Sequence, residues 1–205
     1  MASRTVVCAD TTEWIKTQSD LSSVITSLPD AEETSLGIIE WQKWFVRIVE
    51  EICKRVKPTG YAIFYQTDRK TKGHIIDKSY LVTKGARLAG VKTIFHKIFL
   101  KREVGARNPF RPTYTHLLCF SSKGTPGKAT PDVLPAGKMI YKNAMGLTAC
   151  RFAVEYLKDK GVKTITDPFC GRGSVLAVAN KLGLDAVGVD ILEEQCDYAK
   201  KIKLL

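Results

Sequence analysis

The chain reads Thr164-Ile165-Thr166-Asp167-Pro168-Phe169-Cys170-Gly171-Arg172-Gly173-Ser174 near its C-terminal end, and Val187-Gly188-Val189-Asp190 follows shortly after. A strand, a tight glycine turn, a helix and a second strand that ends in a carboxylate form half of a nucleotide-binding sheet. Only two strands of that sheet fit between Val162 and Leu205, so the remaining strands are expected from the N-terminal side. The sequence therefore predicts an α/β, Rossmann-like domain in circularly permuted order.

The glycines of this turn predict a ligand site. Gly171 and Gly173 allow the backbone to turn sharply and to approach a ligand, and the helix that opens near Ser174 directs free amide groups at it. Asp190, at the carboxyl end of the next strand, is placed to accept hydrogen bonds from two ribose hydroxyls. The pattern indicates a cofactor that contains adenosine.

Several adenosine cofactors fit such a turn, and the residues discriminate among them. A phosphate-binding loop requires Gly-Lys-Ser/Thr, whereas this chain has Gly-Arg-Gly-Ser. A dinucleotide fingerprint requires a third glycine at position 176, where Leu176 stands. Asp167 would repel a pyrophosphate but suits the cationic amino group of S-adenosylmethionine. A strand-turn-helix unit without any ligand stays open as the alternative.

These motifs also carry a resemblance to a known family. The stretch 167–174 resembles the Asp-Pro-Phe-Cys-Gly-Ser-Gly-Thr motif of the S-adenosylmethionine-dependent amino-methyltransferases of the circularly permuted DNA (N4-cytosine/N6-adenine) type. Cys8-Ala9-Asp10, Trp14 and the stretch 24–30 are similar to that family's opening, and the stretch 110–121 resembles its late hairpin strand. The likeness covers nearly the whole chain in order.

The resemblance implies a methyltransferase fold and a set of cofactor contacts. Asp10 would accept a hydrogen bond from the adenine amino group, and the two glycines of the turn would lie beneath the methionine part. A helix starting near Asn143 would flank the same pocket. The expected cofactor-binding residues are Asp10, Asn143, Asp167, Pro168, Phe169, Gly171, Gly173, Ser174, Asp190 and Ile191.

The target motif of that family is altered here to Ser27-Leu28-Pro29-Asp30. In the family, the first residue and the carbonyl that follows it accept hydrogen bonds from the target amino group, and a closing aromatic residue stacks on the flipped base. Asp30 replaces the aromatic residue, and a carboxylate cannot stack. The open interpretations are a different target atom, a partner protein that supplies the ring, lost catalysis, or a plain strand-to-loop exit. Ser27, Leu28, Pro29 and Asp30 are the candidate catalytic residues.

The charge distribution points to a polyanionic partner. The formal net charge is +11, and the segment 68–112 supplies nine of these surplus charges, with twelve cationic residues against three acids. Such a surface is expected of a protein that follows phosphates, although a merely solvated basic face is the alternative. The candidate nucleic-acid-binding residues are Arg69, Lys70, Lys72, Lys78, Arg107 and Arg111.

Alternating apolar runs and helical patterns predict a single methyltransferase domain over residues 1–205. Its target-side half is expected over residues 1–121, a Gly/Pro/Lys-rich loop over 122–142 and the cofactor-binding half over 143–205. Apolar residues at spacings of three and four predict a helix over 36–56. Seven strands are expected, at 5–9, 22–26, 61–66, 93–100, 115–121, 162–166 and 187–190. They predict a mostly parallel sheet with an antiparallel hairpin between the strands near residues 93 and 115, and with the termini side by side.

Other residue types narrow the class of protein. Six cysteines without a Cys-x-x-Cys pair predict reduced core residues of an intracellular protein, cytoplasmic or nuclear. Three histidines, at 74, 96 and 116, are scattered along the sequence, so no metal site is predicted. No apolar run approaches the ~20 residues of a membrane span, and residues 1–10 lack the pattern of a secretion signal.

The sequence thus predicts an S-adenosylmethionine-dependent methyltransferase that acts on a nucleic-acid base, with an amino nitrogen as the acceptor. RNA is favoured over DNA, because the loop near residues 121–138 is too short for a module that reads DNA sequence. Recognition of the substrate alone or with a protein partner stays open. The alternatives are a catalytically inactive methyltransferase fold that serves as a nucleic-acid-binding or scaffolding subunit, and a methyltransferase for proteins or small molecules, which the charge disfavours.

Overall fold

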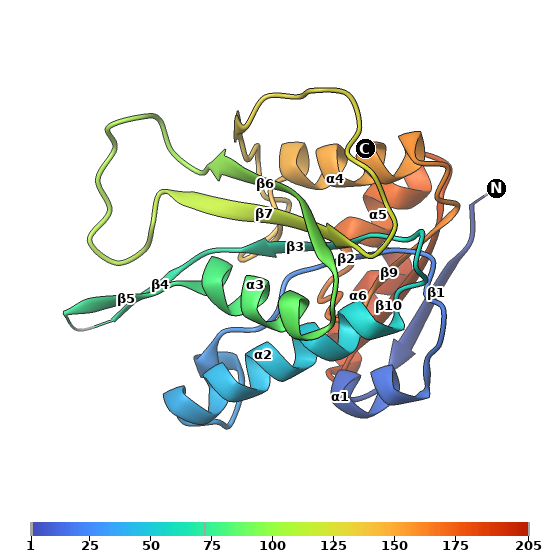
Figure 1. The fold of residues 1–205 in the computed structure, drawn as a ribbon, viewed down its shortest axis with the longest axis horizontal. Coiled ribbons are helices and arrows are strands. Elements are labelled where there is room, and N and C mark those ends of the chain that lie inside the picture. Colours follow the sequence, from blue (N-terminus) through green and yellow to red (C-terminus); the bar gives the residue numbers. More distant parts are fainter. Residues whose placement is uncertain (1, 72, 205) are drawn as a thin grey trace.

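An eight-stranded sheet organises the chain in the computed structural model, which describes residues 2–71 and 73–204 (Figure 1). The strands lie in the order β1 (Arg4–Cys8), β10 (Asp185–Asp190), β9 (Thr164–Asp167), β2 (Val24–Thr26), β3 (Ala62–Gln66), β7 (Tyr114–Ser121), β6 (Lys92–Leu100) and β8 (Val133–Pro135). Within the described residues, the pairings of β7 with β3 and β6 are antiparallel and the other pairings of this eight-stranded sheet are parallel. The Rossmann-like methyltransferase fold with its antiparallel hairpin is therefore confirmed.

The order of the strands is the permuted one. β9, which leads into the glycine turn, lies between β10 from the C-terminal part and β2 from the N-terminal part. β1 extends the cofactor side by pairing with β10, with Cys8 opposite Asp190. The Arg4 guanidinium donates to the carbonyls of Ala199 and Ile202, at 2.8 Å each, so the first and last parts of the fold are adjacent.

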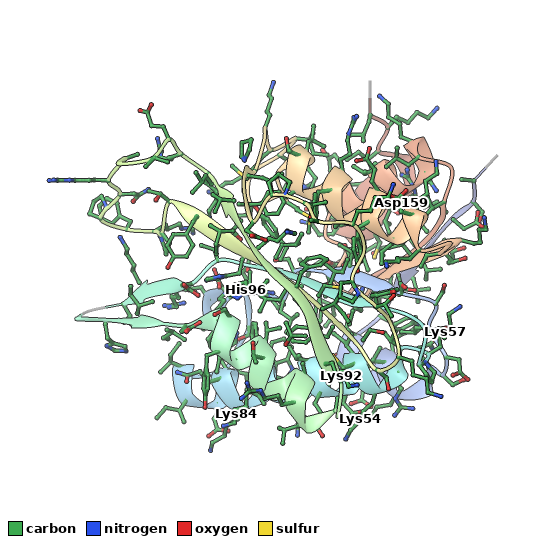
Figure 2. The ribbon with its side chains drawn as sticks, turned by 45° about the horizontal axis from the view of Figure 1, so that its top comes forward. Lys54, Lys57, Lys84, Lys92, His96 and Asp159 are labelled. Carbon is green, nitrogen blue, oxygen red and sulfur yellow. The ribbon has the colours of Figure 1, made fainter. Side chains whose placement is uncertain are left out.

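Helices cover both faces of the sheet. They are α1 (Thr11–Trp14), α2 (Ile38–Arg55), α3 (Lys78–Leu88), α4 (Leu147–Asp159), α5 (Ser174–Lys181) and α6 (Glu193–Lys201), with the 3-10 turns η1 (Ile15–Thr17) and η2 (Ala31–Glu33). Figure 2 shows the charged side chains of Lys54 on α2, Lys84 on α3 and Lys92 at the start of β6 at the surface.

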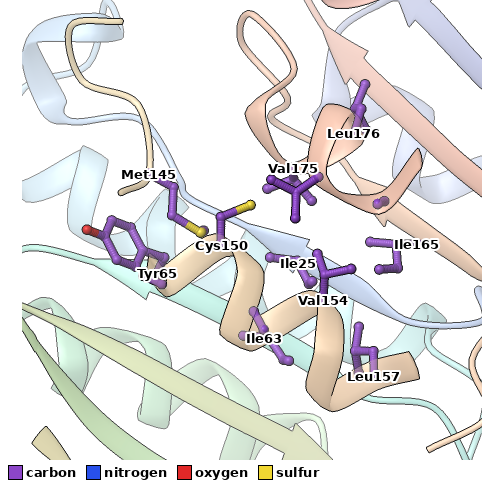
Figure 3. Packing of buried hydrophobic residues seen from close by; sticks show 14 of the residues in the cluster. Ile25, Ile63, Tyr65, Met145, Cys150, Val154, Leu157, Ile165, Val175 and Leu176 are labelled. Carbon is purple, nitrogen blue, oxygen red and sulfur yellow. The ribbon is translucent and has the colours of Figure 1, made fainter. Parts of the chain in front are cut away.

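Two hydrophobic cores follow from the alternation of side chains along the strands. Ile25 and Ile63 point to the face covered by α4 and α5, where they join the cluster drawn in Figure 3. Their neighbours Val24 and Phe64 point to the opposite face, against α2 and α3. Because both faces are buried, the central strands are apolar on both sides, as expected for parallel strands covered by helices.

The structure corrects several expected boundaries. The sheet has eight strands rather than seven, because the short β8 lies in the predicted loop. A separate hairpin of β4 (Arg69–Thr71) and β5 (His74–Ile76) was not predicted either, since three-residue strands carry almost no periodic signal. α4 begins at Leu147, not near Asn143, because Asn143 has φ 66°, a left-handed conformation outside any helix.

The cysteines match the prediction of core thiols except at one position. All six lie within the described residues and are unpaired, and five are buried while Cys8 is exposed. Within residues 2–71 and 73–204, no helix combines the length and apolar character that crossing a bilayer requires.

Candidate active site

The cofactor turn and the target motif leave the sheet side by side. β2 and β9 are parallel neighbours, with Val24 opposite Thr166. At their carboxyl ends the Thr26 hydroxyl donates to Asp167 Oδ1 at 2.7 Å, and the Phe169 N–H donates to the same oxygen at 3.2 Å. This buried contact joins the strand that precedes Ser27 to the strand that precedes the glycine turn.

Asp167 is buried at the end of β9, where an ionised carboxylate is poorly solvated. Burial raises its pKa to about 7, and the nearby Asp190 adds to the rise, while the hydrogen bonds from Thr26 and Phe169 oppose it. A positively charged group beside Asp167 would restore the ionised carboxylate. The turn therefore suits a cationic ligand group better than a phosphate.

The two turn glycines have different tasks. Gly171 has φ 49°, and a Cβ built there would meet only the Tyr141 hydroxyl, at 4.0 Å, so its backbone is open to a ligand. Gly173 has φ 82°, and a Cβ there would lie 2.9 Å from the Cα of Ala199. Gly173 therefore allows close packing of α6 against the start of α5, whereas the expectation of ligand approach fits Gly171 alone.

Asp190 is fixed at the edge of this turn. Its Oδ2 accepts from the Gly171 N–H at 3.0 Å and its Oδ1 from the Leu192 N–H at 2.9 Å. A carboxylate has about four lone-pair sites, so both oxygens keep capacity for the two hydroxyls of a ribose. The next residue, Ile191, is exposed and places an apolar side chain beside that position.

The segment after β1 docks on the same turn. Asp10 is exposed and caps α1 by accepting from the Thr12 N–H at 2.6 Å. The Thr11 hydroxyl donates to the carbonyl of Pro168, and the ring of Phe169 packs edge to face against Trp44 with centroids 6.0 Å apart. Asp10, Pro168 and Phe169 thus lie around one turn, while contact of Asp10 with adenine stays a prediction.

Tyr141 is a site residue that sequence reasoning missed. The Ser174 hydroxyl donates to the Tyr141 hydroxyl at 2.7 Å, and the Arg172 guanidinium lies 5.8 Å from the Tyr141 ring and 4.5 Å from that of Tyr198. Tyr141 is the one aromatic residue between Ser121 and Gly146, which was the available signal. The exposed Asn143 lies two residues further along the same segment.

The backbone of the target motif is held by its neighbours. Ser27 is exposed, whereas Leu28 is buried in the core beneath it. The Trp41 indole N–H donates to the Pro29 carbonyl at 3.1 Å, and the Asp30 N–H donates to Glu33 Oε2 at 2.8 Å. The motif therefore presents Ser27 at the sheet edge on a fixed loop.

Asp30 is paired with Lys78, which corrects the expected role of that lysine. The Lys78 side chain is 3% exposed, forms an ion pair with Asp30 and lies 5.5 Å from the centre of the Trp41 ring. Its ammonium is also 3.5 Å from Gln66 Oε1. The prediction that Lys78 is a surface phosphate contact is wrong, because the first turn of α3 directs this side chain into the core.

Two of the three histidines meet in the fold, contrary to the expectation that all are scattered. His96 Nε2 lies 2.9 Å from His116 Nδ1, and His116 Nε2 lies 2.9 Å from Asp68 Oδ2. Burial alone would raise the pKa of Asp68, but the contacts with His116 lower it below its usual value. Asp77 also lies within 4.8 Å of this pair, but its carboxylate caps α3 through the Tyr80 N–H at 2.8 Å. Because hydrogen bonds engage these groups, we assign the cluster a structural role.

The remaining basic candidates lie on two projecting segments. Arg69 forms an ion pair with Glu32, and the Lys70 ammonium donates to the Asn108 carbonyl at 2.6 Å. Arg107 and Arg111 are exposed on the loop between β6 and β7. Lys72 lies outside the described residues.

Comparison with known proteins agrees with this site. A family model described as DNA methylase matches residues 140–201, which include α4, the glycine turn, β10 and α6. The comparison with curated proteins finds no match. The matched segment holds most of the predicted cofactor residues.

Solved structures share the fold at low sequence identity. TTHA0409 of Thermus thermophilus, assigned as a DNA modification methylase and complexed with S-adenosyl-L-methionine, is 18% identical with a TM-score of 0.71, covering 97% of this chain and 93% of that one. The cytosine-N4-specific PvuII DNA methyltransferase is 13% identical with a TM-score of 0.77, covering 97% and 86%. The M1.HpyAVI–SAM complex is 15% identical with a TM-score of 0.64, covering 96% and 97%. The expected resemblance is confirmed, and the predicted enzyme class and cofactor agree with these findings.

Proposed function

We propose that the chain transfers a methyl group from S-adenosylmethionine to an exocyclic amino nitrogen of a base in DNA. The bound cofactor supplies an electrophilic methyl group on a sulfonium. The protein supplies binding, orientation of the target amino group and exclusion of water, which are the contributions expected of a protein scaffold around a reactive cofactor.

The hydrogen bond between Thr26 and Asp167 carries the proposal. It places the exit of the target strand and the exit of the cofactor strand against each other, so that Ser27 and the glycine turn share one edge of the sheet. In doubly wound sheets ligands bind at such carboxyl-terminal edges. Residues 1–121 then hold the target and residues 143–205 hold the cofactor, with 122–142 as the connection.

The residues present fit this cofactor. Asp167, whose pKa is raised to about 7, would regain its charge next to the cofactor ammonium. Asp190 would accept from the ribose hydroxyls, Gly171 would allow close approach, and Asp10 and Ile191 would bound the adenine. Asn143 and Ser174 would line the remaining side together with Tyr141.

The target side uses the altered motif. Ser27 and the Leu28 carbonyl would accept hydrogen bonds from the amino group of the base, which orients its nitrogen toward the methyl. Asp30 is neutralised by the buried Lys78, whose ammonium also lies over the Trp41 ring. In this proposal Asp30 is a further acceptor at the target edge, and base stacking comes from elsewhere.

DNA is the proposed substrate, although the sequence alone favoured RNA. Both the family model and the similar structures name DNA, and no comparison supports the preference for RNA. The net charge of +11 suits either polymer. An inactive scaffolding subunit is not favoured, because the cofactor turn is intact. A protein partner that helps to recognise the substrate remains compatible with the proposal.

The test is direct. The purified chain is titrated with S-adenosylmethionine in a calorimeter and then incubated with the radiolabelled cofactor and either duplex DNA or total RNA. The proposal expects cofactor binding and label in DNA, at N4 of cytosine or N6 of adenine after nucleoside analysis. Label in RNA alone would contradict the choice of DNA, and cofactor binding without transfer to either polymer would favour the inactive alternative.

A further inference from the structure

Two arms project from the edge of the sheet that holds the target motif. The hairpin arm is formed by the paired strands β4 and β5, and the loop arm is the segment 101–113 between β6 and β7. β3 and β6 run in the same direction, because both are antiparallel to β7. Both arms therefore leave at the carboxyl edge beside Ser27, and Figure 1 shows them extending beyond the body of the protein.

Hydrogen bonds fix the bases of the arms to each other. The Lys101 ammonium donates to the Thr67 hydroxyl at 2.7 Å, and the Tyr114 hydroxyl donates to Asp68 Oδ2 at 3.0 Å. Further out, Lys70 of the hairpin arm donates to the Asn108 carbonyl of the loop arm. Together the arms line an open groove of about 440 Å³, whose lining includes Lys70, Ile75, Arg107, Asn108, Pro109 and Tyr114.

The arms are cationic. The loop arm carries Lys101, Arg102, Arg107 and Arg111 against one acid, Glu103. The hairpin arm adds Lys70 and Arg69, of which Arg69 is ion-paired with Glu32, and has no acidic residue between positions 69 and 76. Charges of one sign on two sides of a groove suit the two phosphate backbones of a nucleic acid.

The loop arm also presents an aromatic ring to solvent. The Phe110 side chain is 81% exposed and Val104 is 87% exposed. The backbone under the ring is held in place, because Asn108 Oδ1 accepts from the N–H groups of Phe110 at 2.9 Å and Arg111 at 3.1 Å. An exposed ring on a fixed cationic loop is what proteins use to insert between bases or to stack on them.

We propose that the two arms bind duplex DNA in place of a separate recognition module, with cations of both arms on the phosphates and Phe110 inserted beside the flipped target base. This inference rests on the proposed function. It also supplies an aromatic contact to the DNA at a site whose target motif has Asp30 instead of a ring.

Equilibrium binding tests the arms without requiring methyl transfer. Fluorescence anisotropy of a labelled DNA duplex of about 25 base pairs is followed across a salt series, because phosphate contacts make the affinity salt-dependent. The variants are Lys70→Ala/Arg107→Ala and Phe110→Ala. The matched control for charge is Arg87→Ala/Lys92→Ala, which removes one arginine and one lysine, both exposed, from the end of α3 and the start of β6. Lys92 lies at the opposite end of β6 from the loop arm (Figure 2), and Leu88→Ala is the matched apolar control.

The arms are expected to dominate binding. Lys70→Ala/Arg107→Ala should reduce the slope of log affinity against log salt by about 1.8, since each phosphate contact contributes about 0.9. Phe110→Ala should weaken binding about tenfold without changing that slope, because stacking contributes about 1–3 kcal/mol for each base. A duplex with a mismatch should bind the wild type more tightly than a matched one, because a mismatched base costs less to unstack.

Three results would overturn the inference. If both arm variants bind DNA like the two controls while the wild type methylates DNA, the arms are not the interface and the proposed function stands. Tighter binding of the wild type to an RNA duplex than to a DNA duplex would overturn the choice of partner. If the wild type binds cofactor but neither binds nor methylates DNA, the proposed function fails together with the inference.

Discussion

Replacing Asp167 by asparagine should stabilise the cofactor-free protein while weakening its affinity for the cofactor. The carboxylate is buried, and its pKa is raised from an ordinary 3.8 to about 7. The shift of roughly 3 units corresponds to about 4 kcal/mol by which ionisation of Asp167 disfavours the folded state at about pH 8. Asparagine keeps Oδ1, the atom that accepts from both Thr26 and Phe169, so these two hydrogen bonds can persist.

The sign of the pH dependence follows from the raised pKa. Between about pH 4 and pH 7 the unfolded chain has lost the proton that folded Asp167 still holds, so the free energy of unfolding falls as pH rises, by up to ~1.4 kcal/mol per unit. Above about pH 7 both states are ionised and this contribution is constant. The asparagine variant lacks this pH dependence. The difference in free energy of unfolding between the variant and the wild type should therefore grow from about pH 5 to about pH 8.

Thermal and urea unfolding at these two pH values measure the effect. At about pH 8 the variant should gain up to about 4 kcal/mol, or roughly 8–16 °C in melting temperature for a domain of this size. Asp159→Asn, which also removes one carboxylate but at an exposed position, is the matched control. It should change neither the free energy of unfolding nor the melting temperature. Calorimetric titration should show a tenfold or larger loss of S-adenosylmethionine affinity in Asp167→Asn, because a charge-assisted hydrogen bond is lost. An equal gain at both pH values, or a loss of stability at the higher one, would refute the electrostatic argument.

Three further predictions concern the turn, the buried ion pair and the loop arm. Gly173→Ala should lower the free energy of unfolding by about 2–4 kcal/mol in urea, because a φ of 82° strains any side chain and the new methyl group would meet Ala199. An unchanged urea midpoint would contradict the packing role of Gly173. Asp30→Leu should cost about 2 kcal/mol or more by leaving the buried Lys78 ammonium without its carboxylate, and a second change, Lys78→Met, should recover part of that loss in a double-mutant cycle, whereas additive losses would contradict the pairing. Burial, together with the charges of Arg111 and Lys78, lowers the pKa of Lys101 to about 8. DNA affinity should therefore fall as pH rises through this value, because the ammonium loses its charge. Lys101→Arg stays charged and should remove this fall in affinity in an anisotropy titration.

The cofactor half was predictable because its signals are local. A strand, a glycine turn and a second strand ending in Asp190 determine one another within about thirty residues, and the structure places them as expected. The helix over residues 36–56 was equally readable, since its apolar spacing persists over about five turns and α2 covers Ile38–Arg55. Three-residue strands such as β4, β5 and β8 have no such repeat and form only because neighbouring backbone is available for pairing.

The target half was harder to predict because its chemistry depends on pairs of residues distant in the sequence. Asp30 taken alone looks like a lost stacking residue, and Lys78 taken alone looks like one of twelve surface cations in its segment. The role of each residue depends on the other: Lys78 is buried beside the Trp41 ring, and the Asp30 carboxylate compensates the charge of the Lys78 ammonium. His96 and His116 behave in the same way: far apart in the sequence, they meet across the antiparallel register of β6 and β7. Local motifs therefore identify the cofactor, whereas the mode of binding the target depends on contacts that only the sheet topology creates.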